Sequence, residues 1–230
     1  LGGMMDMGLF KNTLIVIASD HGEAFRERGI EGHARFVFKE TTEVPLIVLF
    51  PFRLLEREAV VRSRTRNVDI WPTLLDLLGL PPIEGAEGRS LVPLIVAAGR
   101  GDENQATELV DRPVFSQVNS AWGSAERPPR HLISLVREPY RFVHLRDSEG
   151  VQLFDHDADP GERVSIAKDR PELVDDFMIE VDEFLARKNA GWEQALEVEI
   201  SEMRLNQLRA LGYSMPELKN PKKRRETGVD

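Results

Sequence analysis

A short apolar run that ends abruptly in polar residues places the strongest constraint on how this chain can fold. Residues 14–17 read Leu-Ile-Val-Ile, and such a run predicts a strand buried on both faces, as in a parallel sheet. The run leads into Asp20, His21 and Gly22. Open α/β sheets bind ligands at the carboxyl ends of their strands. Asp20 and His21 are therefore candidates for half of a metal site, with Gly22 allowing a sharp turn.

The same residues also fit a simple turn, in which Asp20 caps the next helix and Gly22 adopts a positive φ. On the tripeptide alone the two interpretations are equally good. The continuation favours the site, because His33 follows twelve residues after His21 and residues 44–50 predict a second buried strand.

Further motifs follow in a fixed order along the chain. They read Val44-Pro45-Leu46-Ile47, then Val68-Asp69-Ile70-Trp71-Pro72-Thr73-Leu74-Leu75-Asp76, Gly88-Arg89-Ser90-Leu91, Gln152-Leu153-Phe154-Asp155 with Asp159-Pro160-Gly161-Glu162, and Gln207-Leu208-Arg209-Ala210-Leu211-Gly212-Tyr213. Together with Ser-Asp-His-Gly-Glu at residues 19–23, this order resembles the sulfatase branch of the alkaline-phosphatase superfamily. The matching segments cover most of residues 10–213.

The resemblance implies an α/β fold, namely the C-terminal part of an alkaline-phosphatase-like α/β sheet domain followed by a small antiparallel sheet with C-terminal helices. Residues 1–112 would belong to the α/β domain and hold half of the metal site, and residues 113–213 would form the smaller subdomain. We expect the basic tail, residues 214–230, to be disordered. The chain starts with Leu1 and contains neither the family's Cys/Ser-x-Pro-x-Arg nucleophile motif nor its upstream Asp pair. We therefore expect the N-terminal half of the domain to be its missing partner.

The resemblance also implies roles for individual residues. Asp20 and His21 would supply two metal ligands, and His33 would act in catalysis, as a ligand or as a group at the substrate's leaving oxygen. Arg35 lies where a cation could meet the anionic group of a sulfate- or phosphate-ester substrate, and Glu23 could support the metal ligands. The three remaining histidines are interpreted as structural or surface residues: His131, His144 and His156.

The identity of the metal and the reaction stay open at this point. Calcium is the implied cofactor of a sulfatase, whereas the His21 imidazole suits the zinc or manganese of a phosphatase-like enzyme better. Hydrolysis of sulfate esters is the leading hypothesis. The alternatives are a phosphodiester or phosphomonoester hydrolase or a phosphoglycerol transferase of the same superfamily, and a non-catalytic remnant or binding module.

Composition narrows the classes of protein further. The formal net charge of −9 argues against a general nucleic-acid-binding protein. The absence of cysteine excludes disulfides and thiolate metal ligands within this chain. No apolar run reaches the roughly 18 residues of a transmembrane helix, so no membrane segment is predicted here. A periplasmic or exported location is implied by the family resemblance alone.

The remaining pattern predicts the other elements. Helical periodicity indicates helices over residues 70–78, 91–98, 171–188 and 193–211, and alternation indicates antiparallel strands over residues 114–118, 131–136 and 140–145. Pro160 and Gly161 occupy the central positions of a turn and suit type II.

Overall fold

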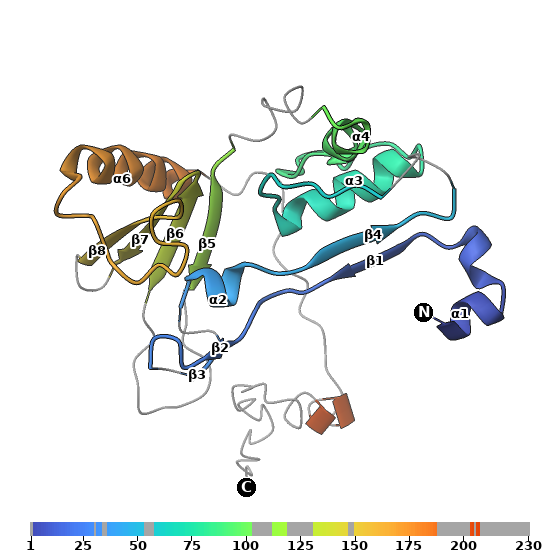
Figure 1. Ribbon diagram of the computed structural model, residues 1–230, viewed down its shortest axis with the longest axis horizontal. Helices are drawn as coiled ribbons and strands as arrows, with labels where there is room; N and C mark the ends of the chain where they lie inside the picture. The colour runs from blue at the N-terminus through green and yellow to red at the C-terminus, as the bar shows by residue number, and fades with distance from the viewer. Residues whose placement is uncertain are drawn as a thin grey trace, which may run out of the picture.

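The computed structural model describes residues 2–29, 31–33, 36–52, 58–102, 112–118, 131–146 and 150–187, together with residues 203, 204, 206 and 207. Within these ranges two sheet regions lie side by side, with helices over each of them (Figure 1). The predicted mixed α/β fold with a separate antiparallel sheet is confirmed.

The first region begins with α1 (Gly2–Asp6) and the 3₁₀ helix η1 (Leu9–Asn12), which lead into β1 (Ile15–Ala18). Strand β1 pairs with β4 (Leu46–Leu49), as the two apolar runs predict. The pairing is antiparallel, so the prediction of a parallel strand is wrong. An apolar run reports burial but not direction, and direction is decided by how the chain returns to the sheet.

Burial on both faces is also wrong for β1. Ile17 and Ile47 face each other across the two strands, and they are 40% and 50% exposed. Residues directly opposite in an antiparallel pair share a face of the sheet. One face of the β1–β4 pair therefore presents apolar side chains to the surroundings.

The chain returns from β1 to β4 through a small hairpin and one helical turn. The hairpin consists of β2 (Ala24–Phe25) and β3 (Glu31–Gly32), and the turn is α2 (Lys39–Thr42). These elements lie at the end of β1 that carries Asp20 and His21, on the side that faces the second sheet (Figure 1).

Two helices cover the β1–β4 pair. The 3₁₀ helix η2 (Asn67–Asp69) continues into α3 (Ile70–Leu77), and α4 (Val92–Arg100) follows. Pro72 lies in the first turn of α3, and Gly79 follows its end with a φ of 65°. Both features agree with the prediction, since proline lacks only a donor that the first turn does not use and glycine adopts positive φ without strain.

The second region is a four-stranded antiparallel sheet in the order β5 (Val114–Val118), β6 (Leu132–Arg137), β7 (Tyr140–Leu145) and β8 (Gly150–Asp155). The three predicted strands are confirmed, and β8 was not predicted. The predicted long helix is α6 (Pro171–Ala186), which lies across one face of this sheet (Figure 1). The hydrophobic core between this sheet and α6 is fully buried at its centre, which consists of Leu135, Phe142, Leu153, Phe177 and Val181.

The opposite face of the second sheet contacts the segment that follows His33. Val37 and Phe38 pack there against Leu132, Val143 and Phe154. This contact joins the two regions, because residues 36–42 continue from the predicted site. The apolar pattern of two phenylalanines and a valine after His33 thus fixes the site segment onto the second sheet.

The turn after β8 differs from its prediction. Glu162 N–H donates to the Asp159 carbonyl at 3.0 Å, so residues 159–162 do form a turn. Type II geometry requires a positive φ at Gly161, but the positive φ, 49°, falls on Glu162 instead. The assignment to type II is therefore wrong, and Glu162 accepts a conformation that non-glycine residues seldom adopt.

Some predicted elements lie outside the described residues, namely most of the helix over residues 193–211 and the whole basic tail, residues 214–230. Among the helices that are described, none combines the length and the apolar character needed to cross a membrane.

Candidate active site

Asp20 and His21 lie directly beyond the end of β1, and their side chains converge. Asp20 Oδ2 is 3.7 Å from His21 Nε2. The other ring nitrogen of His21, Nδ1, lies 3.0 Å from the Gly22 carbonyl. Because a carbonyl oxygen only accepts, this contact places the proton on Nδ1 and leaves the Nε2 lone pair available on the side of Asp20.

His33 is brought to the same place by the β2–β3 hairpin. Its ring stacks on that of His21 with a centroid separation of 4.1 Å. His33 Nδ1 is 2.9 Å from Oε2 of Glu23, the residue directly before β2. The side chains of both residues are about half-exposed. A carboxylate on one ring nitrogen orients the imidazole and directs the other nitrogen away from it.

The donor atoms fit a divalent metal ion. One ligand atom from each of His21, Glu23 and His33 lies within 4.8 Å of the others, and Asp20 adds a carboxylate next to His21. Mixed imidazole and carboxylate donors suit zinc or manganese, while calcium takes oxygen ligands. The residues therefore fit a metal site, and the choice between Asp20 and Glu23 as the carboxylate ligand stays open.

The Asp20 carboxylate is held in its ionised form. Backbone N–H groups of Asp20 itself and of His21 lower the pKa of Asp20. A deprotonated carboxylate is the form that binds a metal ion.

Gly22 has a different role from the one predicted. It is absent from the glycines with positive φ, and the chain continues into β2 rather than a helix, so the simple-turn interpretation is wrong. Gly22 N–H donates to the Thr41 carbonyl at 2.9 Å. A Cβ at this position would lie 2.2 Å from the Glu40 carbonyl oxygen. Glycine is required because α2 approaches the backbone here, which makes α2 the support of the Asp20–His21 turn.

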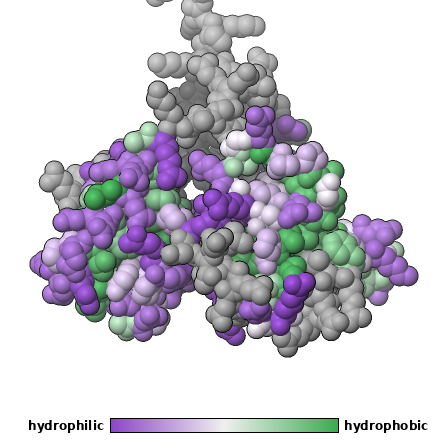
Figure 2. Space-filling view, turned by 90° about the horizontal axis from the view of Figure 1, so that it is seen from above, coloured by the Kyte–Doolittle hydropathy of each residue, from purple (hydrophilic) through white to green (hydrophobic). Residues whose placement is uncertain are grey.

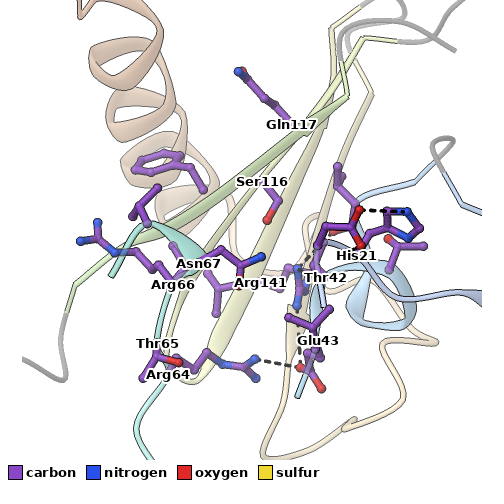
Figure 3. Close-up of a pocket in the computed structure, with 18 of the residues that line it drawn as sticks. His21, Thr42, Glu43, Arg64, Thr65, Arg66, Asn67, Ser116, Gln117 and Arg141 are labelled. Carbon is purple, nitrogen blue, oxygen red and sulfur yellow. Dashed lines mark hydrogen bonds and ion pairs between the residues drawn. The ribbon is translucent and has the colours of Figure 1, made fainter. Parts of the chain in front are cut away.

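A cavity of about 1050 Å³ opens in front of these residues. Figure 3 shows its walls, which come from the His21 turn, from residues 62–67 and from strand β5. Asn67 Nδ2 donates to the Ser19 carbonyl at 3.2 Å, so the second wall is tied to the end of β1. Within that wall Arg64 forms ion pairs with Glu43 and Glu138. Charged side chains therefore line this wall of the cavity.

Two buried carboxylates support these walls, and neither was predicted. Asp69 is fully buried and forms ion pairs with Arg66 and Arg112. Burial raises the pKa of Asp69, but the Arg66 hydrogen bond, the Arg89 amide and both arginine charges outweigh it and lower the pKa overall. The spacing of Arg66 three residues before Asp69 is a signal that sequence reasoning could have used.

Glu162 is the second buried carboxylate, and its contact with His156 gives that histidine a structural role, one of the two interpretations that the sequence left open. His156 lies in the turn directly after β8, but its side chain is only 11% exposed, and its Nε2 lies 2.9 Å from Glu162 Oε1. Arg141, also buried, forms an ion pair with the same carboxylate oxygen. A long-range arrangement of this kind leaves no local sequence pattern, apart from the rarity of charged residues inside alternating strands.

The structure brings Asp20, His21, Glu23 and His33 together, as predicted, while their chemical roles stay predictions. Arg35, the predicted substrate-binding cation, lies outside the described residues.

Solved structures share the fold of this chain. The structure of BT4656 in complex with its substrate D-glucosamine-2-N,6-O-disulfate matches with a TM-score of 0.66 and 21% identity, covering 84% of this chain and 39% of that one. The phosphonate monoester hydrolase of Agrobacterium radiobacter matches with a TM-score of 0.62 and 23% identity, covering 80% and 37%. At these identities the likeness establishes the fold alone.

The family follows from sequence. The C-terminal domain of N-sulphoglucosamine sulphohydrolase matches residues 32–186, which is more than half of the chain, so the chain belongs to this sulfatase family. Arylsulfatase K of Gallus gallus is 30% identical over 182 residues, or 76% of this chain and 31% of that protein. The Delta 4,5-hexuronate-2-O-sulfatase of Bacteroides thetaiotaomicron is 32% identical over 162 residues, or 69% and 31%. The chain thus spans about a third of the length of these relatives.

Proposed function

We propose that this chain is the C-terminal part of a metal-dependent sulfatase that hydrolyses sulfate esters. The observation that carries the proposal is the convergence of Asp20, His21 and His33 at one edge of a cavity, in a chain that belongs to a sulfatase family. Its missing partner would be the N-terminal half of the same domain, which would bring the nucleophile and the remaining metal ligands.

Asp20 and His21 would hold the metal ion, with Glu23 as a further candidate ligand. When bound, the ion would neutralise the anionic ester group in the cavity. The contribution of this chain is to fix the ligands before the substrate arrives. The Gly22 hydrogen bond to α2 and the His21 contact with the Gly22 carbonyl supply that order.

His33 would act on the leaving group. Glu23 Oε2 accepts a hydrogen bond from His33 Nδ1–H. This bond orients the ring and leaves Nε2 available to contact the substrate. In its protonated form Nε2 would donate a proton to the ester oxygen as the bond from that oxygen to sulfur breaks and sulfur bonds to the nucleophile of the N-terminal half, leaving neutral imidazole and an alcohol. Arg35 would add positive charge for the anionic group, as the family resemblance implies.

Hydrolysis of a phosphate or phosphonate ester is the second candidate function. The favouring observation is the Asp20–His21 pair itself, whose imidazole suits zinc or manganese, together with the fold likeness to a phosphonate monoester hydrolase. Both candidates use the same residues, so only the substrate separates them.

The test uses the full-length protein and paired aryl sulfate and aryl phosphate substrates. Asp20→Ala should lower kcat/KM on the preferred substrate by on the order of a thousandfold, because it removes a metal ligand and with it stabilisation of the transition state. Asp175→Ala, which removes an exposed carboxylate on α6, should leave the rate unchanged. Near-normal turnover of Asp20→Ala on both substrates would show that the metal interpretation is wrong.

His33→Ala should cost less, about a hundredfold, if it protonates the leaving oxygen. Its effect should shrink on esters with good leaving groups, which need little protonation. A loss of equal size across leaving groups would instead make His33 a metal ligand. The 230-residue chain by itself should turn over neither substrate, because it contains no Cys/Ser-x-Pro-x-Arg motif.

A further inference from the structure

Glu162 is the point at which the two sheet regions are tied together. Its side chain has no exposed surface, although it sits in the turn after β8. Oε1 accepts from Arg141 Nε and lies 2.9 Å from His156 Nε2. Oε2 accepts from the Lys39 backbone N–H and from Arg28 Nη2, both at 3.2 Å. Every partner is a donor, so the carboxylate is satisfied as an anion.

Two of these partners belong to the segment that carries the site. Arg28 lies in the loop of the β2–β3 hairpin, between Glu23 and His33 in sequence. Its guanidinium also donates to the carbonyls of Gly161 and Glu162, and it stacks over the Phe38 ring at 4.0 Å. The hairpin is thereby fastened to the turn after β8.

The other partner, Lys39, begins α2. Arg141 Nη1 adds bonds to the Thr42 hydroxyl and the Val37 carbonyl, both at 3.1 Å. Within the same helix, the carbonyl of Thr41 accepts a hydrogen bond from the N–H of Gly22, the residue after His21. Glu162 and Arg141 therefore hold α2, and α2 holds the turn that presents the metal ligands.

We propose that Glu162 is a positioning residue for the active site, acting on the Asp20–His21 turn through α2 and on the Glu23–His33 pair through Arg28. The proposal rests on the proposed function for its catalytic meaning, but the mechanical coupling stands on the contacts alone. A buried carboxylate ringed by donors is well suited to this task, since none of its bonds can be replaced by water.

Electrostatics keep Glu162 in the form that the network needs. Burial raises its pKa, but the His156 hydrogen bond, the Arg141 charge and the Lys39 amide outweigh burial and lower the pKa to about 2. The residue is an anion at any ordinary pH. Glu162→Gln would keep the shape of the side chain, remove this charge and leave the buried Arg141 with only the more distant carboxylate of Glu43, at 3.8 Å, as a counter-ion.

The matched control is the Arg137–Glu180 ion pair, which joins strand β6 to α6. Glu180 pairs with an arginine of the same sheet, on the side covered by α6, and has no bond to α2 or to the hairpin. Glu180→Gln therefore removes an ion pair of the same sheet, more exposed than the Glu162–Arg141 pair, without touching the site segment.

The experiment is amide hydrogen exchange on the full-length protein, read at Gly22 and at the β2–β3 amides. Glu162→Gln should speed exchange at both places by about tenfold or more, because local opening would no longer break buried bonds. Glu180→Gln should leave both rates unchanged. Equal acceleration in the two variants, or none in Glu162→Gln, would overturn the proposal.

Arg28→Gln covers the case in which Glu162→Gln fails to fold, since Arg28 is partly exposed and the Glu162–Arg141 pair stays intact. It should speed exchange in the hairpin but not at Gly22, which α2 still holds. Unchanged hairpin exchange would overturn the proposal.

Activity supplies a second readout. In full-length Glu162→Gln, kcat should fall on the order of a hundredfold with KM changed less than about twofold, as expected when reacting groups are misplaced by roughly 1 Å. A protein with no sulfatase activity at all would refute the proposed function while leaving the exchange result valid.

Discussion

The two main sheets of this molecule differ in how completely their apolar side chains are buried. In the second sheet α6 covers a core in which Leu135, Phe142 and Leu153 are completely buried. In the first, Ile17 and Ile47 face outward, and a cavity of about 800 Å³ remains between β4 and α3. Figure 2 shows the same contrast at the surface, which is mainly hydrophilic over the α6 side and more hydrophobic over the α3–α4 side.

The well-packed core and the candidate active site therefore lie in different regions of the molecule. The region with the complete core carries no predicted metal ligand, and the region with Asp20, His21 and His33 has the open face. Residues at an exposed edge are not fixed by packing around them, so their order has to come from elsewhere. Here it comes from the well-packed sheet, through Glu162 and Arg141.

The sharpest test of the contrast is a pair of phenylalanine substitutions. Phe142→Ala should lower the free energy of unfolding by about 3–5 kcal/mol, since it empties a fully buried position that stacks on Phe177. Phe25→Ala, in the hairpin, should change it by less than about 0.5 kcal/mol because that ring is 74% exposed. Urea denaturation measures both, and similar losses would contradict the division into a packed and an open region.

Local patterns explain why most elements were predictable. Helix α3 has apolar residues at helical spacing, an early proline and a terminal glycine, and β5, β6 and β7 are short runs rich in β-branched and aromatic residues. Residues 132–136 of β6 are buried one after another rather than in alternation, because α6 covers one face of the sheet and residues 36–38 cover the other. Strand β8 was missed because residues 150–155 match a family motif and lack clear alternation. The antiparallel direction of β4 could not be predicted, because it depends on the connection from β1 to β4. The hairpin in that connection has only two paired residues in each strand, too few to give a recognisable sequence pattern.

The site divides in the same way. Asp20 and His21 could be predicted because a strand that ends in an acid and a histidine is unusual, and His33 followed from the family resemblance. Glu162 and Arg141 could not, because they bond to the backbone of Lys39 and Val37, more than 100 residues away in the sequence. His156 could not either, because its partners Arg64, Glu138 and Glu162 come from separate elements. Such contacts exist only in the folded chain.

Acid should weaken the junction between the two regions. The pKa of Glu162 is about 2 in the folded protein against 4.5 for the free side chain, so folding favours the ionised form. Its contribution, about 3 kcal/mol, is fully present above pH 4.5 and is lost as the pH falls toward 2. Asp69, whose pKa is also lowered, contributes with the same sign.

Urea midpoints measured from pH 6 down to pH 3 check this dependence. Glu162→Gln should be less stable at pH 6 and should show a flatter decline with acid, whereas Glu180→Gln should decline as steeply as the wild type. A wild-type midpoint that does not change between pH 6 and pH 3 would rule out a buried, ionised Glu162.

A small effect on stability is also expected at the open face of the first sheet. In the 230-residue chain Ile17 and Ile47 lie side by side and exposed, so this face should bind a hydrophobic dye and promote aggregation. Replacing both with threonine keeps β-branched residues in the strands, so unfolding should change by less than about 1 kcal/mol. Dye fluorescence should fall clearly, because both exposed apolar side chains of the cross-strand pair would be replaced. Ile179→Thr is the control: that isoleucine is 59% exposed on α6 and should contribute little to dye binding. An equal drop with Ile179→Thr would mean that exposed apolar residues act singly, and the contrast between the two sheets would lose its meaning for solubility.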